Sequence, residues 1–494
     1  MSASVTTPHA ATSIDRLRLL IDGAWREGEG PPLSVVSPST GQAVAQGGTA
    51  SEAQVRWAIE AAARAYRAFS RMPLYERAAL CHGVATALRR RLDRAARDLA
   101  IEQGKPLAEA TVEVQVAAEM FEAAGEDVKR LTGEVLPSSD PTRQIFVTRE
   151  PLGVVTVITP WNFPMTIPSE YLAACLAAGN TMVWKPASYT PVSAHHLAEC
   201  FSEAGVPEGV LNLVLGPGSA VGQAFAAHPA VTAFGVTGSP ETGEAIARLA
   251  GMRRLLLELG GNGPAIVTED ADLDRAIPRI AVGCFANAGQ ICDSTERILV
   301  HERLHSALVE GLVEAARQIR LDASLAEGAT MGPLNNEETA AKVDRHLAEA
   351  RGGGARILTG GGRARGRPTA LYYEPTVIDG VQPAMLLNRE ETFGPVAPIL
   401  TFRTDEEAVT LANDTELGLV AGVFTRDIAR ANFYAQSLRA GIVNVNETPT
   451  YWQPHTPFGG YAGTRSGLGR LGGKYTILEL TQIKTIVVDV SPGQ

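Results

Sequence analysis

Three kinds of hydrophobic pattern follow one another along the chain. In the first, apolar residues recur with the helical period at Val55, Ala58, Ile59, Ala62, Ala65, Tyr66 and Phe69. Thr49 and Glu52 precede this run and are predicted to form its capping box. Residues 49 to about 126 are therefore predicted to be mainly helical.

The second pattern alternates short apolar runs with helical segments. Predicted buried strands lie at Val154–Ile158, Thr181–Trp184, Leu211–Leu215 and Ala233–Val236. A helix is predicted from Ser169 to Ala178, before Gly179. A second unit of this kind begins after Glu258 with the strand Ala265–Val267. The alternation predicts an α/β fold with a doubly wound parallel sheet.

The third pattern is extended and rich in β-branched residues. It occurs between about Asp127 and Gly153, around Ile145–Thr148, and again near the C-terminus at Thr485–Val490. We interpret the first of these segments as an extended arm, with a surface loop as the alternative. The C-terminal strand would promote aggregation if its edge stayed bare, so its burial against another subunit is expected.

Length and composition limit the possible classes of protein. A chain of 494 residues is predicted to form two or more domains. Its net charge of -10 gives no reason to expect nucleic acid or an anionic membrane as a partner. Five scattered cysteines without a CxxC motif argue against disulfides and a zinc site, so we expect no metal and a cytoplasmic location. No apolar run approaches the roughly eighteen residues of a membrane span, and the first fourteen residues resemble no signal peptide.

Cys292 is the candidate nucleophile. It follows the small residues Ala288 and Gly289, whereas Glu258 and Asn162 lie in Gly- or Pro-bounded settings upstream. A thiol, a general base and an oxyanion donor are the groups that thioester chemistry needs. Buried cysteines are more often structural, and that interpretation is kept for Cys81, Cys175, Cys200 and Cys284.

Five ordered motifs place Cys292 in a family context. PWNFP, LELGG, GQIC followed by an arginine, EETFGP and PFGG occur in this order, and the chain resembles the aldehyde dehydrogenase superfamily from about Ile21 to Val488. The resemblance implies a Rossmann-like cofactor domain at 15–128 and 149–258, with 462–479 returning to it. It also implies an α/β catalytic domain at 259–461 and a small β oligomerisation arm at 129–148 and 480–494. A homodimer or homotetramer is expected.

The cofactor predicted by this resemblance is NADP or NAD. Gly238-Ser239 through Gly243 follows a strand and opens a helix, which favours an anion, and it is a better phosphate candidate than the turn containing Gly218. The resemblance adds further cofactor residues: Ile158, Trp161, Lys185, Ser188, Thr242, Leu259, Glu391 and Phe393. Ser188 stands where NAD-selective relatives commonly have glutamate, so we predict that NADP is used at least comparably.

The resemblance also implies a substrate pocket and a reaction. The pocket residues are Phe163, Ile167, Glu170, Asp293, Trp452 and Phe458. Glu170 stands where succinate-semialdehyde oxidisers commonly have arginine, which predicts poor use of succinic semialdehyde and better use of neutral or cationic aldehydes. The predicted reaction oxidises an aldehyde to the acid through a Cys292 thioester, hydrolysed with Glu258 as base. The alternatives are a CoA-acylating enzyme and a catalytically silent structural relative.

Overall fold

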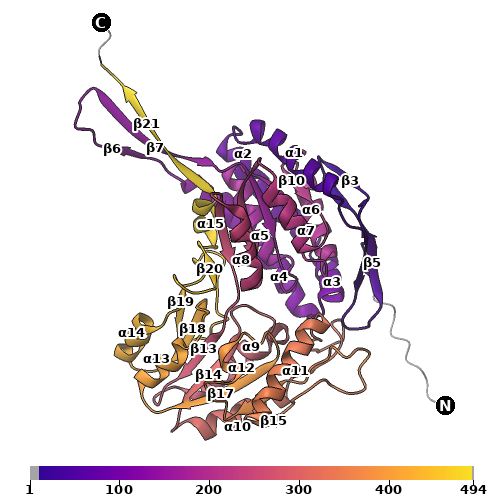
Figure 1. The fold of residues 1–494 in the computed structure, drawn as a ribbon, viewed down its shortest axis with the longest axis vertical. Helices are drawn as coiled ribbons and strands as arrows, with labels where there is room; N and C mark the ends of the chain where they lie inside the picture. The colour runs from indigo at the N-terminus through magenta and orange to yellow at the C-terminus, as the bar shows by residue number, and fades with distance from the viewer. Residues whose placement is uncertain (1–10, 492–494) are drawn as a thin grey trace, which may run out of the picture.

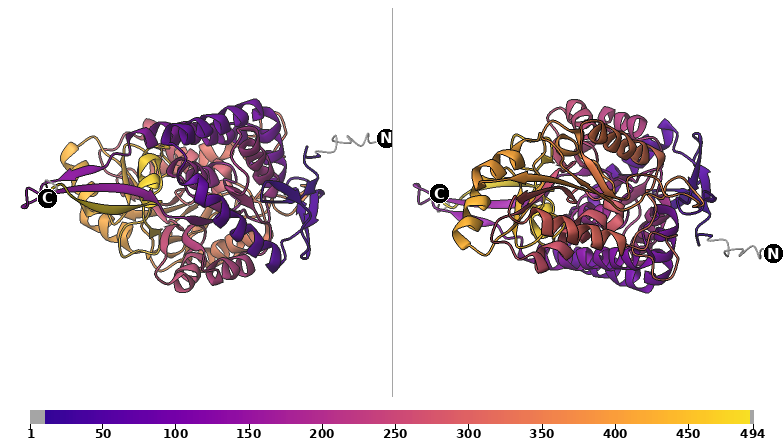
Figure 2. Two further views of the ribbon diagram at one scale, coloured as in Figure 1. Left: turned by 90° about the horizontal axis from the view of Figure 1, so that it is seen from above. Right: turned by 90° about the horizontal axis from the view of Figure 1, so that it is seen from below.

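Two largely parallel sheets form the body of the molecule, and a narrow arm projects from it (Figures 1 and 2). The computed structural model describes residues 11–491. What we call the N-terminal sheet has the order β20 (Gly467–Leu468), β12 (Arg254–Glu258), β11 (Val231–Thr237), β8 (Val154–Ile158), β9 (Thr181–Lys185), β10 (Leu211–Leu213), β2 (Leu19–Ile21) and β3 (Ala24–Arg26). The C-terminal sheet has the order β15 (Arg356–Thr359), β16 (Thr376–Asp379), β17 (Val396–Phe402), β14 (Thr295–His301), β13 (Gly263–Val267), β18 (Val420–Phe424) and β19 (Ile442–Val445).

Helices cover both sheets, which explains why their central strands are continuous apolar runs. All residues of β8, β9, β13 and β18 are buried, as expected for parallel strands covered on both faces. The N-terminal half contributes α1 (Glu52–Phe69), α2 (Leu74–Arg90), α3 (Leu92–Gln103), α4 (Leu107–Asp127), α5 (Thr166–Ala178), α6 (Pro191–Glu203), α7 (Gly218–Ala227) and α8 (Pro240–Ala250). The later helices are α9 (Leu273–Phe285), α10 (His305–Arg317), α11 (Glu337–Gly352), α12 (Leu386–Arg389), α13 (Asp405–Asn413), α14 (Ile428–Ser437) and α15 (Gly473–Glu479). The predicted α/β fold with a doubly wound parallel sheet is confirmed.

A short connection brings the two sheets together at defined edges. β12 ends at Glu258 and β13 begins at Gly263, so only residues 259–262 separate the carboxyl end of one strand from the amino end of the next. The carboxyl edge of the N-terminal sheet therefore faces the amino edge of the C-terminal sheet. β20 returns late in the chain and pairs antiparallel with β12, through Leu468 opposite Leu257.

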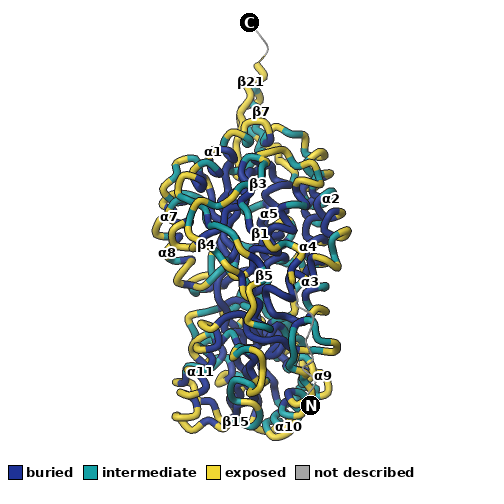
Figure 3. The backbone as a smooth tube through the Cα atoms, turned by 90° about the vertical axis from the view of Figure 1, so that its right-hand side faces the viewer, coloured by how far each residue is buried: buried dark blue, intermediate teal, exposed yellow. Residues whose placement is uncertain are grey.

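The arm is a three-stranded antiparallel sheet of β6 (Glu134–Leu136), β7 (Arg143–Pro151) and β21 (Thr481–Asp489). β21 pairs with β7 along its whole length, from Thr481 opposite Pro151 to Asp489 opposite Arg143. The predicted extended arm and its C-terminal partner strand are thus present. The arm stays exposed in the single chain while both halves of the body have buried interiors (Figure 3).

The predicted cap of the first helix was wrong. Ser51 is the N-cap of α1: its hydroxyl accepts from the backbone N–H of Gln54, and the Gln54 side chain accepts from the Ser51 N–H. Thr49 instead donates its hydroxyl to the carbonyl of Pro31 at 3.0 Å. It directly follows β5 (Ala43–Gly48), the central strand of a sheet with β1 (Arg16–Leu17) and β4 (Pro32–Val36). Among residues 11–491, no helix combines the length and the apolar character needed to cross a bilayer.

Candidate active site

Cys292 lies at the amino edge of the C-terminal sheet, three residues before β14. The segment that presents it is left-handed at three consecutive residues, with φ of 48° at Asn287, 55° at Ala288 and 71° at Gly289. This conformation is costly for residues other than glycine and persists only where surrounding contacts fix it. A Cβ at Gly289 would lie 2.1 Å from the carbonyl oxygen of Gly394, so no larger residue fits there.

The connection after β12 passes directly behind the nucleophile. A Cβ at Gly261 would lie 2.0 Å from the carbonyl oxygen of Cys292, which requires glycine at this crossing. Glu258, the last residue of β12, is 3% exposed, and its Oε1 atom has no hydrogen-bond partner among the described residues. The sheet edges thus place this carboxyl beside the thiol.

The electrostatics of the thiol and the carboxyl are coupled. Burial, followed by the charges of Glu170 and Asp293, raises the pKa of Glu258 well above its ordinary value, although its contact with Cys292 opposes the shift. Burial and the neighbouring Glu258 charge likewise raise the pKa of the Cys292 thiol. Both shifts favour the protonated forms of the two groups.

Asn162 follows the carboxyl end of β8 and is 3% exposed. One N–H of its side chain donates to the carbonyl oxygen of Gln290 at 3.0 Å, which ties this amide to the loop that carries Cys292. An amide has two N–H donors, so the second one remains for another acceptor.

These three residues meet in one cavity of about 360 Å³. Its lining combines both facing sheet edges: Pro160, Trp161, Asn162, Ile167, Thr237, Gly238, Ser239, Glu258, Gly260, Cys292, Asn336, Glu338, Thr339, Lys342, Arg345, Glu391 and Phe393. A cavity of this size is within the range of small-molecule sites. Predicted catalytic and predicted cofactor residues are therefore neighbours in the folded chain.

Glu391 and Phe393 are fixed by backbone contacts before β17. The N–H of Gly261 donates to Glu391 Oε1 at 2.9 Å, and burial raises the pKa of Glu391 to about 7. The N–H groups of Thr392 and Phe393 donate to the buried carboxylate of Glu296 at 2.8 and 2.9 Å. These bonds hold Phe393 at a left-handed φ of 60°.

The aromatic ring of Phe393 contacts a residue from the other sheet. It lies edge-to-face with Trp161, and the ring centroids are 5.7 Å apart. Such a pair contributes about 1 kcal/mol beyond its buried area. This contact places Trp161 and Phe393, two predicted cofactor residues from different sheets, side by side in the cavity.

The remaining predicted cofactor residues lie along the carboxyl edge of the N-terminal sheet. Ser239 caps α8 by accepting from the Thr242 N–H at 3.3 Å. Gly243 has the Leu259 side chain within 2.4 Å of its Cβ position, so Leu259 packs against the first turn of this helix. Ile158 is buried at the end of β8, 6% exposed. The N–H groups of a helix N-terminus favour a phosphate here.

Lys185 is a buried cation at the same edge of the sheet. It is 5% exposed, burial lowers its pKa to about 8, and within residues 11–491 it forms neither an ion pair nor a side-chain hydrogen bond. Gly218 stands beside it, with a Cβ position 3.8 Å from Lys185 Nζ. Ser188 donates to the carbonyl oxygen of Gly216 at 3.4 Å. A buried lysine without a partner fits a ligand that brings hydroxyls or a phosphate.

The four apolar residues predicted for the substrate pocket lie in three different environments. Trp452 and Phe458 form an edge-to-face pair at 6.3 Å, and both pack in one apolar cluster with Cys292. Ile167 lines the main cavity instead. Phe163 packs against the N-terminal core, with the Lys105 ammonium 3.8 Å above its ring.

Glu170 lines a separate small cavity of about 20 Å³ between α4, α5 and the segments around Pro454 and Gly472. Burial and the charge of Asp293 raise its pKa to about 8, and burial raises the pKa of Asp293 itself to about 7. These two acids are therefore close enough to interact, and both lie near Glu258.

Sequence reasoning missed the contribution of α11. Five residues on or just before this helix line the main cavity: Asn336, Glu338, Thr339, Lys342 and Arg345. Asn336 caps the helix through the Thr339 N–H at 3.0 Å. The spacing of Thr339, Lys342 and Arg345 marks one helical face, but a charged helical face usually lies in solvent. Only the position of α11 against the cavity distinguishes it.

Comparisons with known proteins agree with this geometry. The model of the family described as "Aldehyde dehydrogenase family" matches residues 25–486. The chain belongs to the aldehyde dehydrogenase family. This confirms the predicted class of enzyme, an oxidoreductase that acts on an aldehyde with NAD or NADP.

Two curated relatives cover nearly all of this aldehyde dehydrogenase family member. Glutarate-semialdehyde dehydrogenase of Pseudomonas aeruginosa is 38% identical over 475 residues, which are 95% of this chain and 97% of the relative. The NADP-dependent succinate-semialdehyde dehydrogenase of Escherichia coli is 37% identical over 97% of this chain and 98% of the relative.

Solved structures show the same architecture. Succinate-semialdehyde dehydrogenase from Burkholderia pseudomallei superposes with a TM-score of 0.94 at 39% identity, covering 99% of this chain and 100% of that one. Betaine aldehyde dehydrogenase from Staphylococcus aureus in complex with NAD+ gives a TM-score of 0.93 at 32% identity, with 97% and 95% coverage.

Proposed function

We propose that this enzyme oxidises an aldehyde to the free carboxylic acid, with Cys292 as nucleophile, Glu258 as general base and Asn162 as oxyanion donor. The observation that carries the proposal is their convergence, from two sheets, on one cavity that also contains Glu391 and Phe393. The lone Lys185 and the capped turn at Ser239 support binding of NADP or NAD along the same edge.

The protein groups act in a defined order. Cys292 releases its thiol proton to solvent, and its sulfur then attacks the aldehyde carbon. The side-chain N–H of Asn162 and the backbone N–H of Cys292 donate to the oxyanion, and one such donor is worth about 3 kcal/mol. When bound, NAD or NADP would accept the hydride that leaves this carbon, and loss of this hydride converts the adduct on Cys292 to a thioester.

Hydrolysis of the resulting thioester regenerates free Cys292. Glu258, once ionised, takes a proton from a water molecule whose oxygen attacks the thioester carbon. The carbon–sulfur bond breaks and the acid leaves. A CoA-acylating enzyme would transfer the acyl group to a thiol instead, and the position of Glu258 beside Cys292 favours water.

Two variants test the assignment. Glu258→Gln should slow steady-state turnover at least a hundredfold while a burst of NAD(P)H remains, because acylation precedes the step that needs this base. Cys292→Ala should abolish both phases. The measurement is stopped-flow absorbance of NAD(P)H with a generic aldehyde. An unchanged steady-state rate in Glu258→Gln would refute the role of this residue, and an inactive wild type would favour the silent relative.

The substrate proposed for this chain differs in charge from those named for its semialdehyde-oxidising relatives. Glu170 and Asp293 are close to Glu258 and have no cationic partner among the described residues. A carboxylate at the far end of the substrate would be repelled by these acids once they ionise. We therefore infer a preference for neutral or cationic aldehydes over succinic semialdehyde.

The arm supports the proposed homodimer or homotetramer. Ile483 is 63% and Val487 59% exposed on β21, which is a long apolar edge for a monomer. Deleting residues 485–494 should yield monomers or aggregates in light scattering, whereas an intact oligomer would contradict the proposal.

The division into 15–128 with 149–258, 259–461 and the arm stays a prediction, and the distribution of strands between the two sheets supports it. The cytoplasmic location also stays a prediction.

A further inference from the structure

A buried ion pair lies directly behind the Asn162 loop. Lys105 Nζ is 2.6 Å from Glu113 Oε2, and both side chains are almost completely buried. The same ammonium donates to the backbone carbonyl oxygen of Asn162 at 2.9 Å and lies 3.8 Å above the ring of Phe163. All three contacts of Lys105 are therefore made within the protein, and two of them hold residues 162 and 163.

Glu113 holds the other end of this loop. Its Oε1 atom accepts from the N–H of Met165 at 2.8 Å, just before α5 begins. Lys105 and Glu113 thus fix the chain on both sides of Pro164. Neither residue lines the main cavity.

Gln103, two residues before Lys105, holds the loop that carries the nucleophile. Its side-chain N–H donates to Asn287 Oδ1 at 3.0 Å, and its Oε1 accepts from the Lys105 N–H at 2.7 Å. The Asn287 amide in turn donates to the carbonyl oxygen of Asn162 at 3.1 Å. The left-handed segment before Cys292 is therefore fastened to the same turn as Asn162.

Removing an ion pair from water costs free energy, which argues that this arrangement serves more than stability. A buried ion pair is often no more stabilising than well-packed apolar residues of similar volume. Here the polar groups of Lys105 and Gln103 contact two segments that lead into opposite sheets, one with the Asn162 amide and the other with the Cys292 thiol.

We propose that Lys105 and Gln103 are positioning residues: through the turn between α3 and α4, they set the place of the Asn162 amide relative to Cys292. This proposal rests on the function proposed above for those two residues. A displacement of about 1 Å at a reacting group costs on the order of a hundredfold in rate, so loss of this turn's contacts should act mainly on the chemical step.

The test compares Lys105→Met and Gln103→Leu with the wild type in stopped-flow measurements of the NAD(P)H burst. Each variant should lower the burst rate between tenfold and a hundredfold, while the KM for NADP changes less than twofold. The alkylation rate of Cys292 by iodoacetamide, which needs no oxyanion donor, should also change less than twofold. Because both residues act on the same geometry, the double variant should lose less than the product of the single losses.

Asp98→Asn is the matched control. It disrupts another buried pair, between Asp98 and His196 at 2.8 Å, which has no contact with the Asn162 or Cys292 loops. It should lower the melting temperature and leave the burst rate unchanged. If Gln103→Leu, or Lys105→Met where it folds, showed a normal burst rate, the positioning role would be overturned. An equal loss of alkylation and burst would also overturn it, because the effect would then be a general collapse of the site. A wild type that forms no NAD(P)H with any aldehyde would overturn the proposed function together with this inference.

Discussion

The two parallel sheets of this molecule carry their candidate site residues at opposite edges. In the N-terminal sheet, the candidate site residues follow the carboxyl ends of strands, as Asn162 follows β8, Lys185 ends β9 and Ser239 follows β11. In the C-terminal sheet they precede the amino ends, as Cys292 precedes β14 and Glu391 precedes β17. Ligands of open α/β sheets usually lie at carboxyl ends, so only the first sheet follows that rule.

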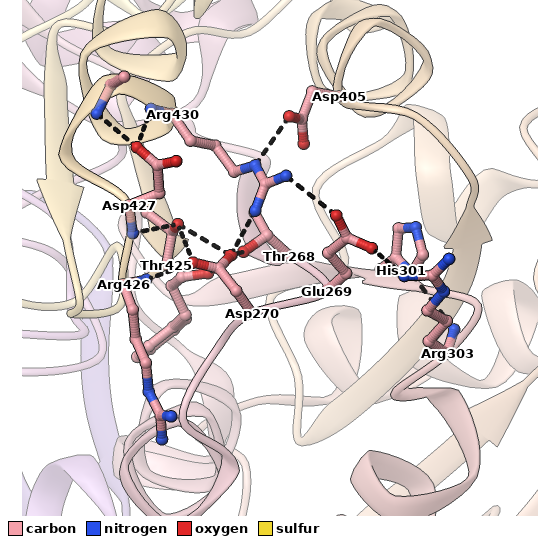
Figure 4. A network of polar contacts seen from close by, with 12 residues as sticks. Thr268, Glu269, Asp270, His301, Arg303, Asp405, Thr425, Arg426, Asp427 and Arg430 are labelled. Carbon is pink, nitrogen blue, oxygen red and sulfur yellow. Dashed lines mark hydrogen bonds and ion pairs between the residues drawn. The ribbon is translucent and has the colours of Figure 1, made fainter.

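The carboxyl edge of the C-terminal sheet is filled by its own ion pairs (Figure 4). Arg430 from α14 contacts Glu269 at 3.2 Å, Asp270 at 2.5 Å and Asp405 at 2.8 Å. Asp270 also accepts from the hydroxyl of Thr425, after β18. Partial burial raises the pKa of Asp270, but hydrogen bonds from Thr268, the Arg426 N–H, Thr425 and Arg430, in order of decreasing effect, hold it below its ordinary value.

The contrast shows what makes a sheet edge available to a ligand. Lys185 at the N-terminal sheet has no partner in the described chain, whereas Arg430 at the C-terminal sheet has three carboxylates. A charge satisfied internally gains little from a ligand, and an unsatisfied one gains much. Changes at the first edge should therefore act on ligands, and changes at the second on stability.

The largest expected effect is at the carboxyl edge of the C-terminal sheet. Arg430→Met should lower the free energy of unfolding by about 2 kcal/mol, because it removes the cation that three carboxylates share. The kcat should stay unchanged. Urea denaturation and steady-state kinetics measure the two quantities. Arg303→Met is the control: Arg303 is 74% exposed and pairs with Glu269 alone, so its loss should cost less than about 1 kcal/mol.

The pH dependence of stability sharpens this prediction. Because the native pKa of Asp270 lies below its unfolded value, its contribution is complete above about pH 4 and is lost as the pH falls towards the native pKa. The difference between wild type and Arg430→Met should therefore shrink below pH 4. A difference that is constant from pH 6 to pH 3, or a large fall in kcat, would contradict the assignment of this edge to stability.

The next largest effect is at the carboxyl edge of the N-terminal sheet. Ser188→Glu should lower the ratio of kcat/KM for NADP over that for NAD at least tenfold, because a carboxylate repels a 2′-phosphate and accepts bonds from ribose hydroxyls. The free energy of unfolding should hardly change. Ser202→Glu adds the same charge at an exposed position of α6 and should leave the ratio unaltered. A wild type that uses NAD a hundredfold better would defeat the cofactor proposal.

The smallest effect concerns substrate charge. Glu170→Gln should raise kcat/KM for succinic semialdehyde about fivefold and leave a neutral aldehyde of equal length unaffected. The pKa of Glu170 is raised to about 8, so its charge forms as the pH rises through this value. The relative use of succinic semialdehyde by the wild type should accordingly fall above pH 8, and the variant should show less of this fall. Efficient use of this substrate by the wild type at pH 9 would refute the role of Glu170.

Local patterns in the sequence determined the elements and several of the reacting groups. Apolar runs predicted β8 and β9, and the arm strands were visible as β-branched segments, because strand and helix periodicity depends on near neighbours. Ordered motifs identified Cys292, Glu258 and Asn162 as candidates. The cap of α1 was missed because Thr49 and Ser51 differ only in which hydroxyl faces the helix N-terminus.

Tertiary structure alone decided which distant residues meet. Nothing near Lys105 in sequence announces its bond to Asn162, 57 positions away, and Gln103 reaches Asn287 across 184 positions. The face of α11 that lines the cavity was equally hidden, as was the saturation of Arg430 by three carboxylates. The reason is physical. The sequence around a charged residue does not indicate whether its partner is water, a ligand or a buried carboxylate, because that partner depends on how the sheets pack.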